Sequence, residues 1–143
     1  MIRSASIDDI EELFKLDQAS REDFWSFSLW ESELNALNSV IRVFSNNSRI
    51  LAALCSRMVD AESELFLVIC HPDARRQGFA NLLLQDWIFL CENHKIEFLF
   101  LEVSHLNVGA IELYVKNGFK KTGLRKNYYK TEEHAVLKSR SLI

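Results

Sequence analysis

A short segment between two predicted elements has the composition of an anion-binding turn. It follows an apolar run that ends at His71-Pro72 and precedes a helical pattern. The small Gly78 and Ala80 let backbone N–H groups approach a ligand, and a helix N-terminus adds partial positive charge. Such a turn could hold a pyrophosphate, and an ordinary strand-to-helix turn with solvated arginines is the alternative. The segment consists of Arg75, Arg76, Gln77, Gly78, Phe79 and Ala80.

Two further side chains are candidates for proton transfer. Glu102 lies near the end of an otherwise apolar run, where burial would raise the pKa of its carboxyl and suit it to take a proton from an amine, directly or through water. Tyr114 lies twelve positions later on the following helical pattern, where its phenol could give a proton to a departing thiolate. The alternatives are a rim glutamate paired with an arginine and a tyrosine packed in the core.

The hydrophobic pattern indicates which elements position these residues. Ser6 and Asp9 form a capping box before the first helix, and Ser28 with Glu31 forms a second box before the next. Gly118 is a natural end for the last helix. We expect strands at 2–5, 40–44, 50–55, 65–70, 96–103, 119–129 and 135–142, and helices at 7–19, 28–37, 77–92 and 107–118.

The two continuous apolar runs, 65–70 and 96–103, predict the centre of the fold. They flank a predicted helix of about fifteen residues, so they form a βαβ unit whose strands should be parallel and adjacent. Antiparallel strands flank this pair on both sides. The sequence therefore predicts a single α+β domain over residues 1–143, with a mixed, mostly antiparallel sheet and ligands near the carboxyl ends of the parallel strands.

Composition excludes several classes of protein. The 143 residues carry 17 basic and 20 acidic side chains, for a formal net charge of −3, whereas proteins that bind duplex nucleic acid through its phosphates are usually basic. The acidic N-terminus and the lack of a long apolar run predict a soluble protein with no secretory signal and no membrane span.

The three cysteines are an odd number and are well separated, which favours free thiols in the reducing cytoplasm. Cys91 and His94 have the spacing of a ligand pair, but no second pair accompanies them, so we expect no metal site.

Several segments, taken in order, resemble the Gcn5-related N-acetyltransferase (GNAT) family. Residues 75–80 match its acetyl-CoA-binding motif R/Q-x-x-G-x-G/A, and the preceding strand ends in x-Pro as is common there. Residues 101–119 resemble the stretch L-E-V-x-x-x-N…A…L-Y…G-F of the RimI-like ribosomal-protein alanine N-acetyltransferase branch. Residues 123–129 resemble that branch's G-x-R-x-N-Y-Y segment.

The resemblance implies roles for individual residues. It makes Glu102 the general base and Tyr114 the general acid of an acetyl-CoA-dependent N-acetyltransferase that forms no covalent enzyme intermediate. Asn107 would contact the cofactor, although an N-cap asparagine would look identical. The backbone groups of Val68 and Cys70 would bind the pantetheine arm.

Two tyrosines of the third segment, Tyr128 and Tyr129, resemble the branch's substrate-side tyrosines, while a cross-strand aromatic pair is the alternative. The implied substrate is a protein N-terminus, the N-terminal alanine of a ribosomal protein. A small-molecule amine and a non-catalytic coenzyme A-binding role are the alternatives. Ser104 and Leu106 stand where the branch usually has arginine and serine, so we expect these positions to affect substrate preference.

Overall fold

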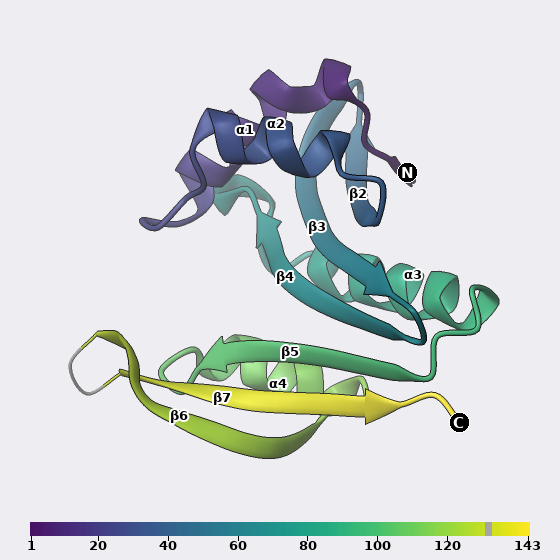
Figure 1. The fold of residues 1–143 in the computed structure, drawn as a ribbon. Coiled ribbons are helices and arrows are strands. Elements are labelled where there is room, and N and C mark those ends of the chain that lie inside the picture. The colour runs from purple at the N-terminus through teal and green to yellow at the C-terminus, as the bar shows by residue number, and fades with distance from the viewer. Residues whose placement is uncertain (131–132) are drawn as a thin grey trace.

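A seven-stranded sheet forms the framework of the protein (Figure 1). The computed structural model describes residues 1–130 and 133–143, and the side chains of 1–126 and 133–143. The strand order is β1-β2-β3-β4-β5-β7-β6. The strands are β1 (Ile2–Ser4), β2 (Ser39–Asn46), β3 (Arg49–Val59), β4 (Glu62–Cys70), β5 (Phe98–Ser104), β6 (Lys120–Lys130) and β7 (Glu133–Ser141). The α-helices are α1 (Ile10–Ser20), α2 (Phe27–Asn35), α3 (Phe79–Asn93) and α4 (Val108–Lys116), and 3-10 turns form at Ile7–Asp9 and Pro72–Ala74.

The α+β class and the predicted element order are confirmed. One predicted cap is wrong: the hydroxyl of Ser26, not Ser28, accepts the hydrogen bond from the Leu29 amide that begins α2. Ser28 lies inside that helix, and the helix ends at Asn35, before the fully exposed Leu37. Over the described residues, no helix combines the length and the apolar character needed to cross a bilayer.

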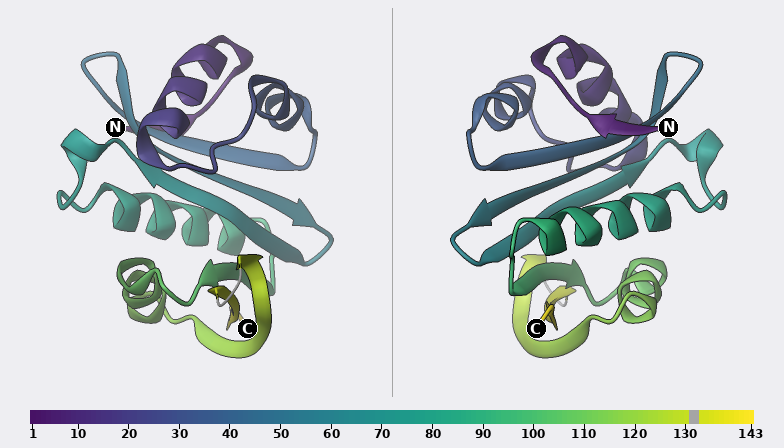
Figure 2. Two further views of the ribbon diagram at one scale, coloured as in Figure 1. Left: turned by 90° about the vertical axis from the view of Figure 1, so that its left-hand side faces the viewer. Right: turned by 90° about the vertical axis from the view of Figure 1, so that its right-hand side faces the viewer.

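The helices cover the two faces of the sheet unequally (Figure 2). On one face, α3 and α4 pack against β3, β4, β5 and β7 around the buried Trp87 and Leu99. On the other face, α1 and α2 pack against β2, β3 and β4 around Leu13 and Trp30. Among the residues that the structure describes, no helix covers the latter face of β5, β7 and β6 (Figure 1). This is the face on which Glu102 lies, because β5 buries the alternate residues Leu101 and Val103 against α3 and α4.

The parallel pair separates halfway along its length. β4 and β5 are paired only from Glu62 with Phe98 to Leu65 with Leu101. The register between β3 and β4 then shifts, so that Phe66 is the extra residue of a β-bulge, and bulges bend a strand. The prediction of a parallel, adjacent pair of strands is confirmed, and the pairing ends at Leu65. The carboxyl halves of β4 and β5 then diverge (Figure 1), and this opens the sheet at its centre.

Candidate active site

One cavity lies between β4, the start of α3 and α4; we call it the α3 cavity. Its volume is about 490 Å³. Gly78 is the N-cap of α3 with φ +83°, a left-handed conformation that glycine adopts without strain. The first N–H groups of α3 have no partner within the helix, so they can donate to an anion. The cavity is lined by Val68, Cys70, Ala74, Arg75, Arg76, Gly78, Phe79, Ala80, Asn81, Gly109, Ala110, Leu113 and Tyr114.

Both arginines of the predicted anion-binding turn line the α3 cavity. Arg75 also donates a hydrogen bond of 2.8 Å to the carbonyl of Ser20, at the end of α1. Arg76 has φ +64°, which marks the turn as tightly bent. Gln77 belongs to this turn but does not line the cavity. The turn therefore presents two cations and a helix N-terminus to the same space.

Cys70 lines the same cavity as a neutral thiol. Burial raises the pKa of this thiol, and the nearby Arg75 only partly opposes the effect. Its Sγ donates to the carbonyl of Ala74 at 3.4 Å. A raised pKa disfavours the thiolate that a nucleophilic cysteine needs, which agrees with a contribution from the main chain of Cys70 only.

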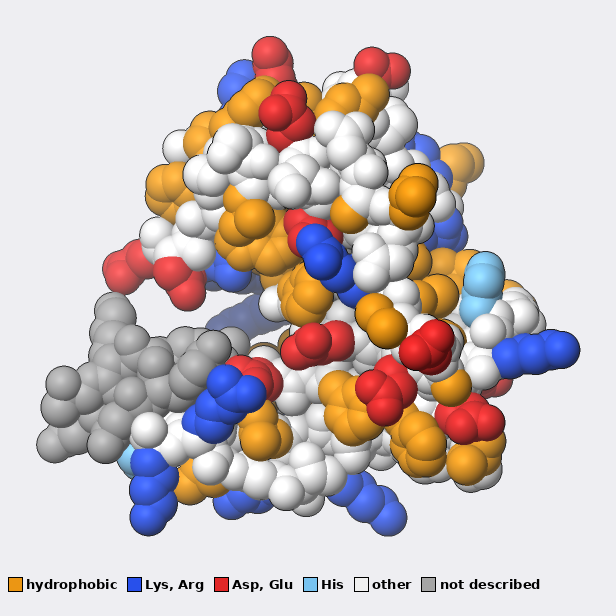
Figure 3. Space-filling model, in the orientation of Figure 1, with side chains coloured by type: hydrophobic (Ala, Val, Ile, Leu, Met, Phe, Trp, Pro, Cys, Tyr) orange, Lys and Arg blue, Asp and Glu red, His pale blue; other side chains and the backbone are white. Residues whose placement is uncertain are grey.

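A second cavity, of about 610 Å³, lies between the diverging ends of β4 and β5; we call it the β5 cavity. In the space-filling view the surface is hollowed in this region (Figure 3). Glu102 lines the cavity with 24% of its side chain exposed, and its Oε1 lies 3.0 Å from Nη2 of Arg125 on β6. The pairing with an arginine holds the carboxylate in place at the cavity wall.

Tyr114 lies where the two cavities meet. Its side chain is 8% exposed, and its ring packs edge-to-face on Phe119 with 5.9 Å between the centroids. Tyr114, Val68 and Ala110 line both cavities. Core packing and access to both cavities are thus combined in one residue, which lines the cavity of the anion-binding turn and the cavity that carries Glu102.

The loop between β5 and α4 forms another wall of the β5 cavity. Asn107 caps α4, since its side chain accepts a hydrogen bond of 3.2 Å from the amide of Ala110. The hydroxyl of Ser104 donates to the Glu133 carboxylate at 2.6 Å and accepts from the amide of Leu106 at 3.2 Å. Ser104, the position that departs from the resemblance, therefore joins β7 to this loop.

The structure places the anion-binding turn in the α3 cavity and Glu102 and Asn107 in the β5 cavity, and Tyr114 lines both. The side chains of Tyr128 and Tyr129 lie outside the described residues. The arginine pair that the sequence analysis gave as the alternative for Glu102 is present, and its partner is Arg125, the R of the G-x-R-x-N-Y-Y segment, which sequence reasoning did not identify. Sequence reasoning also missed Arg21, Asp23 and Glu133, whose approach to the cavity depends on tertiary contacts.

Comparison with known proteins decides the family. Residues 5–119 match the Acetyltransferase (GNAT) family. The chain belongs to this family. It is 33% identical over 121 residues to the ribosomal protein bS18-alanine N-acetyltransferase of Haemophilus influenzae, covering 85% of this chain and 82% of that one.

Solved structures agree with this assignment. The crystal structure of the Escherichia coli ribosomal-protein-S18-alanine N-acetyltransferase superposes with a TM-score of 0.95 at 28% identity, covering 99% of this chain and 93% of that one. The NatC complex bound to Gag peptide and CoA shares the fold, with a TM-score of 0.87 at 18% identity over 100% of this chain and 98% of that one. This GNAT protein is therefore an N-acetyltransferase, and GNAT acetyltransferases use acetyl-CoA.

Proposed function

We propose that this GNAT enzyme transfers the acetyl group of acetyl-CoA to the α-amine of a protein N-terminus, the N-terminal alanine of a ribosomal protein. The observation that carries the proposal is the junction at Tyr114, where a cavity with an anion-binding turn meets a cavity with a carboxylate. The relatives named for this reaction on ribosomal protein bS18 support the choice of substrate.

Acetyl-CoA suits the α3 cavity because its pyrophosphate needs N–H donors and cations. The turn at residues 75–80 and the start of α3 supply both. The backbone of Val68 and Cys70 would bind the pantetheine arm, and Asn107 is proposed to contact the cofactor besides capping α4. The acetyl thioester would then lie near Tyr114, at the opening to the β5 cavity.

The chemistry follows from the two proton-transfer groups. An α-amine has a reference pKa of about 7.7–8.0, so near neutrality it is mostly protonated and must lose one proton before it attacks. Glu102 takes this proton, directly or through water. As the C–N bond forms, backbone N–H groups of β4 near Val68 stabilise the negative charge on the carbonyl oxygen. The C–S bond then breaks, and Tyr114 gives its proton to the thiolate of coenzyme A. The amine nitrogen loses its second proton to the resulting phenolate, directly or through water, which leaves a neutral amide and restores Tyr114.

The three cysteines are all free. Free thiols fit a reducing compartment, and we therefore place the reaction in the cytoplasm. Tyr128 and Tyr129 of the β6 segment are proposed to contact the substrate peptide.

Intact-mass measurement tests the reaction. We expect one acetyl group on the α-amine of an alanine-first peptide, and none on the same peptide with a blocked N-terminus and a free lysine. Acetylation of the lysine or of a small amine instead would contradict the proposed substrate.

The Glu102→Gln substitution tests the base. We expect kcat to fall by about 10²- to 10⁴-fold, while thermal stabilisation by acetyl-CoA is retained, because Glu102 does not line the α3 cavity. Glu92→Gln, which removes the same charge from an exposed site at the end of α3, is the control and should leave kcat unchanged. Unchanged kcat in Glu102→Gln would contradict the role of this carboxylate.

A further inference from the structure

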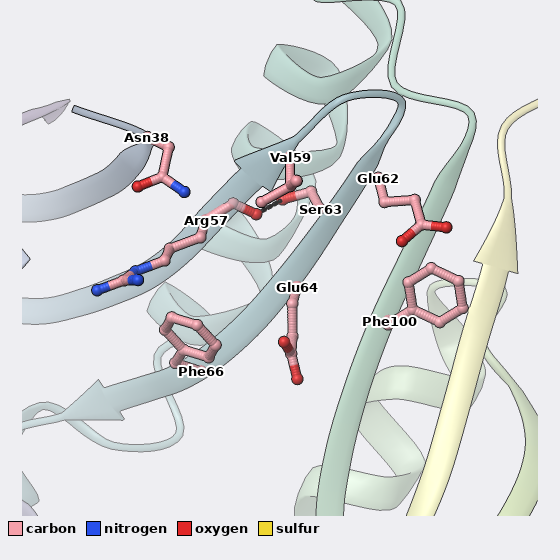
Figure 4. A pocket seen from close by; sticks show the side chains of 8 residues that line it. All are labelled: Asn38, Arg57, Val59, Glu62, Ser63, Glu64, Phe66 and Phe100. Atoms are coloured by element: carbon pink, nitrogen blue, oxygen red, sulfur yellow. Dashed lines mark hydrogen bonds between the residues drawn. The ribbon is translucent and has the colours of Figure 1, made fainter. Parts of the chain in front are cut away.

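A third hollow lies farther along the face of the sheet that has no helix over β5; we call it the β4 groove. Its volume is about 480 Å³. Figure 4 shows that its walls come from β3, β4 and β5 and from the chain just before β2. It is lined by Asn38, Arg57, Val59, Glu62, Ser63, Glu64, Phe66 and Phe100.

The groove combines exposed aromatic rings with carboxylates. Phe66 and Phe100, which line the groove, and Phe98, whose ring lies beside that of Phe100, are between 36% and 39% exposed. Adjacent exposed aromatic side chains mark an interaction surface. Glu64 is in register with Phe100, and Glu62 with Phe98. The Glu64 carboxylate extends between the rings of Phe66 and Phe100 (Figure 4).

The charge left for a ligand in this groove is negative. Arg57, the cation of the groove, is committed to the buried Glu33 through two hydrogen bonds, and its guanidinium lies 5.7 Å from the centre of the Phe66 ring. Neither Glu62 nor Glu64 forms an ion pair with any side chain that the structure describes. Carboxylates beside aromatic rings suit the ammonium or guanidinium of a basic side chain.

The groove adjoins the β5 cavity at one shared residue. Phe66, the bulge residue of β4, lines both the groove and the β5 cavity. Glu102, Phe100 and Phe98 point to the same face of β5 because alternate residues of a strand share a face. An extended peptide advances about 3.3 Å per residue, so a chain whose first residue lies at Glu102 reaches the level of Phe100 and Glu64 with its third residue.

We propose that the β4 groove binds a lysine or arginine side chain at the third to fifth position of the substrate's N-terminal segment. The proposal rests on the proposed function, since it needs a peptide whose α-amine lies at Glu102. It assigns Glu64 and Glu62 as specificity-determining residues that contact the substrate away from the reacting atoms.

Two alanine-first peptides that differ only in lysine or glutamine at positions three to five test this proposal. The enzyme should show a lower KM for the lysine peptide. Glu64→Gln should raise that KM about threefold, the size of an exposed ion pair, and leave kcat and the KM for the glutamine peptide unchanged. Glu64→Lys should reverse the preference. Glu112→Gln, an exposed change of the same charge on α4, should preserve it.

Each outcome has a distinct meaning. Equal KM values for both peptides, or the same rise in KM in Glu64→Gln and Glu112→Gln, would overturn the groove assignment while α-amine acetylation still upheld the proposed function. No α-amine acetylation of either peptide would overturn both. A dimer detected by sedimentation and lost in Glu64→Lys would also overturn the proposal, because the face would then bind a second copy of the chain.

Discussion

Tyr114 lines both the α3 cavity and the β5 cavity. Among the described residues that line both of them, it alone carries a polar side chain. Its ring is also part of the core beneath α4, where it packs on Phe119. The proposed catalytic role and the structural role therefore fall on the same side chain, and substitutions can separate them.

Tyr114→Phe keeps the ring and removes only the proton donor. We expect kcat to fall by about 10²-fold or more, while the free energy of unfolding drops by no more than about 1 kcal/mol, the value of one hydrogen bond. Steady-state kinetics and chemical denaturation measure the two effects. Tyr114→Leu is the comparison, because it should also lose the edge-to-face contact and more stability. An unchanged kcat in Tyr114→Phe would contradict the role of Tyr114 as a proton donor and would assign this side chain to core packing only.

Cys55 gives the protein a predictable loss of stability at alkaline pH. Burial, with the adjacent Glu33 adding to it, raises the pKa of this thiol from 9.0 to about 12. Between pH 9 and 12 the unfolded chain therefore loses the thiol proton while the folded protein keeps it. The unfolded state binds fewer protons, so the free energy of unfolding falls as pH rises through this range. Below pH 9 the thiol is protonated in both states, and its full contribution to the free energy of unfolding is present.

A pH series of denaturation curves measures this loss. Above pH 9 the free energy of unfolding of the native protein should fall faster than that of Cys55→Ala, by at most about 1.4 kcal/mol per pH unit. The difference between the two should be constant below pH 8. Parallel curves across the whole range would show that Cys55 ionises equally in both states.

At the scale of elements, the connection between α1 and α2 is held by one buried carboxylate. Asp17 accepts hydrogen bonds from the Arg21 side chain at 2.5 and 3.1 Å, from the Trp25 amide at 2.9 Å and from Trp30 Nε1 at 3.0 Å. The segment between the two helices places Arg21 and Asp23 at the β5 cavity. Asp17 is thus a positioning residue for one wall of the site.

Asp17→Asn should loosen that wall. Removing the charge that Arg21 faces should lower the free energy of unfolding by about 3 kcal/mol and raise the KM for the peptide more than the KM for acetyl-CoA. Kinetics with each substrate varied in turn, together with denaturation, measure both effects. The control is Asp9→Asn, which breaks the partly exposed ion pair with Arg3. Asp9 directly precedes α1, at the opposite end of the helix from Asp17, so this substitution should change neither KM. Equal increases in both KM values for Asp17→Asn would contradict the positioning role.

Local sequence patterns predicted the helices and strands, but they did not predict the opening between the carboxyl halves of β4 and β5. Continuous hydrophobic runs identified β4 and β5 as a parallel pair, although alternate residues of these strands, such as Phe66 and Phe100, are exposed on one face. The bulge at Phe66 and the separation beyond Leu65 arise from pairing with β3 and β7, which the strand's own residues do not encode. For the same reason the exposed sides of Phe98 and Phe100 and the contact of Arg125 with Glu102 became visible only in the fold. Glu102 and Tyr114 were identifiable because the resemblance assigned them roles that composition left open.

At the scale of the whole molecule, the charge is strongly polarised although its total is small. Residues 1–115 carry 9 basic and 18 acidic side chains, and residues 116–143 carry 8 and 2. The two parts therefore have formal charges of −9 and +6 within a total of −3. Figure 3 shows acidic side chains on the surface near β4 and β5, where a substrate peptide would approach. Such a distribution can speed the encounter with a cationic N-terminal segment.

Ionic strength tests this steering. We expect kcat/KM for a lysine-containing peptide to fall several-fold between about 50 mM and about 500 mM salt, as the Debye length shortens from more than 10 Å to less than 5 Å. The value for the matched glutamine peptide should change little, since it carries fewer charges for the field to attract. Glu64→Gln should retain most of the slope, because steering sums over many carboxylates while the groove contact depends on one or two. If kcat/KM had the same salt dependence for both peptides, the charge asymmetry would serve only surface solvation. If Glu64→Gln abolished the salt dependence for the lysine peptide, the effect would belong to the β4 groove alone.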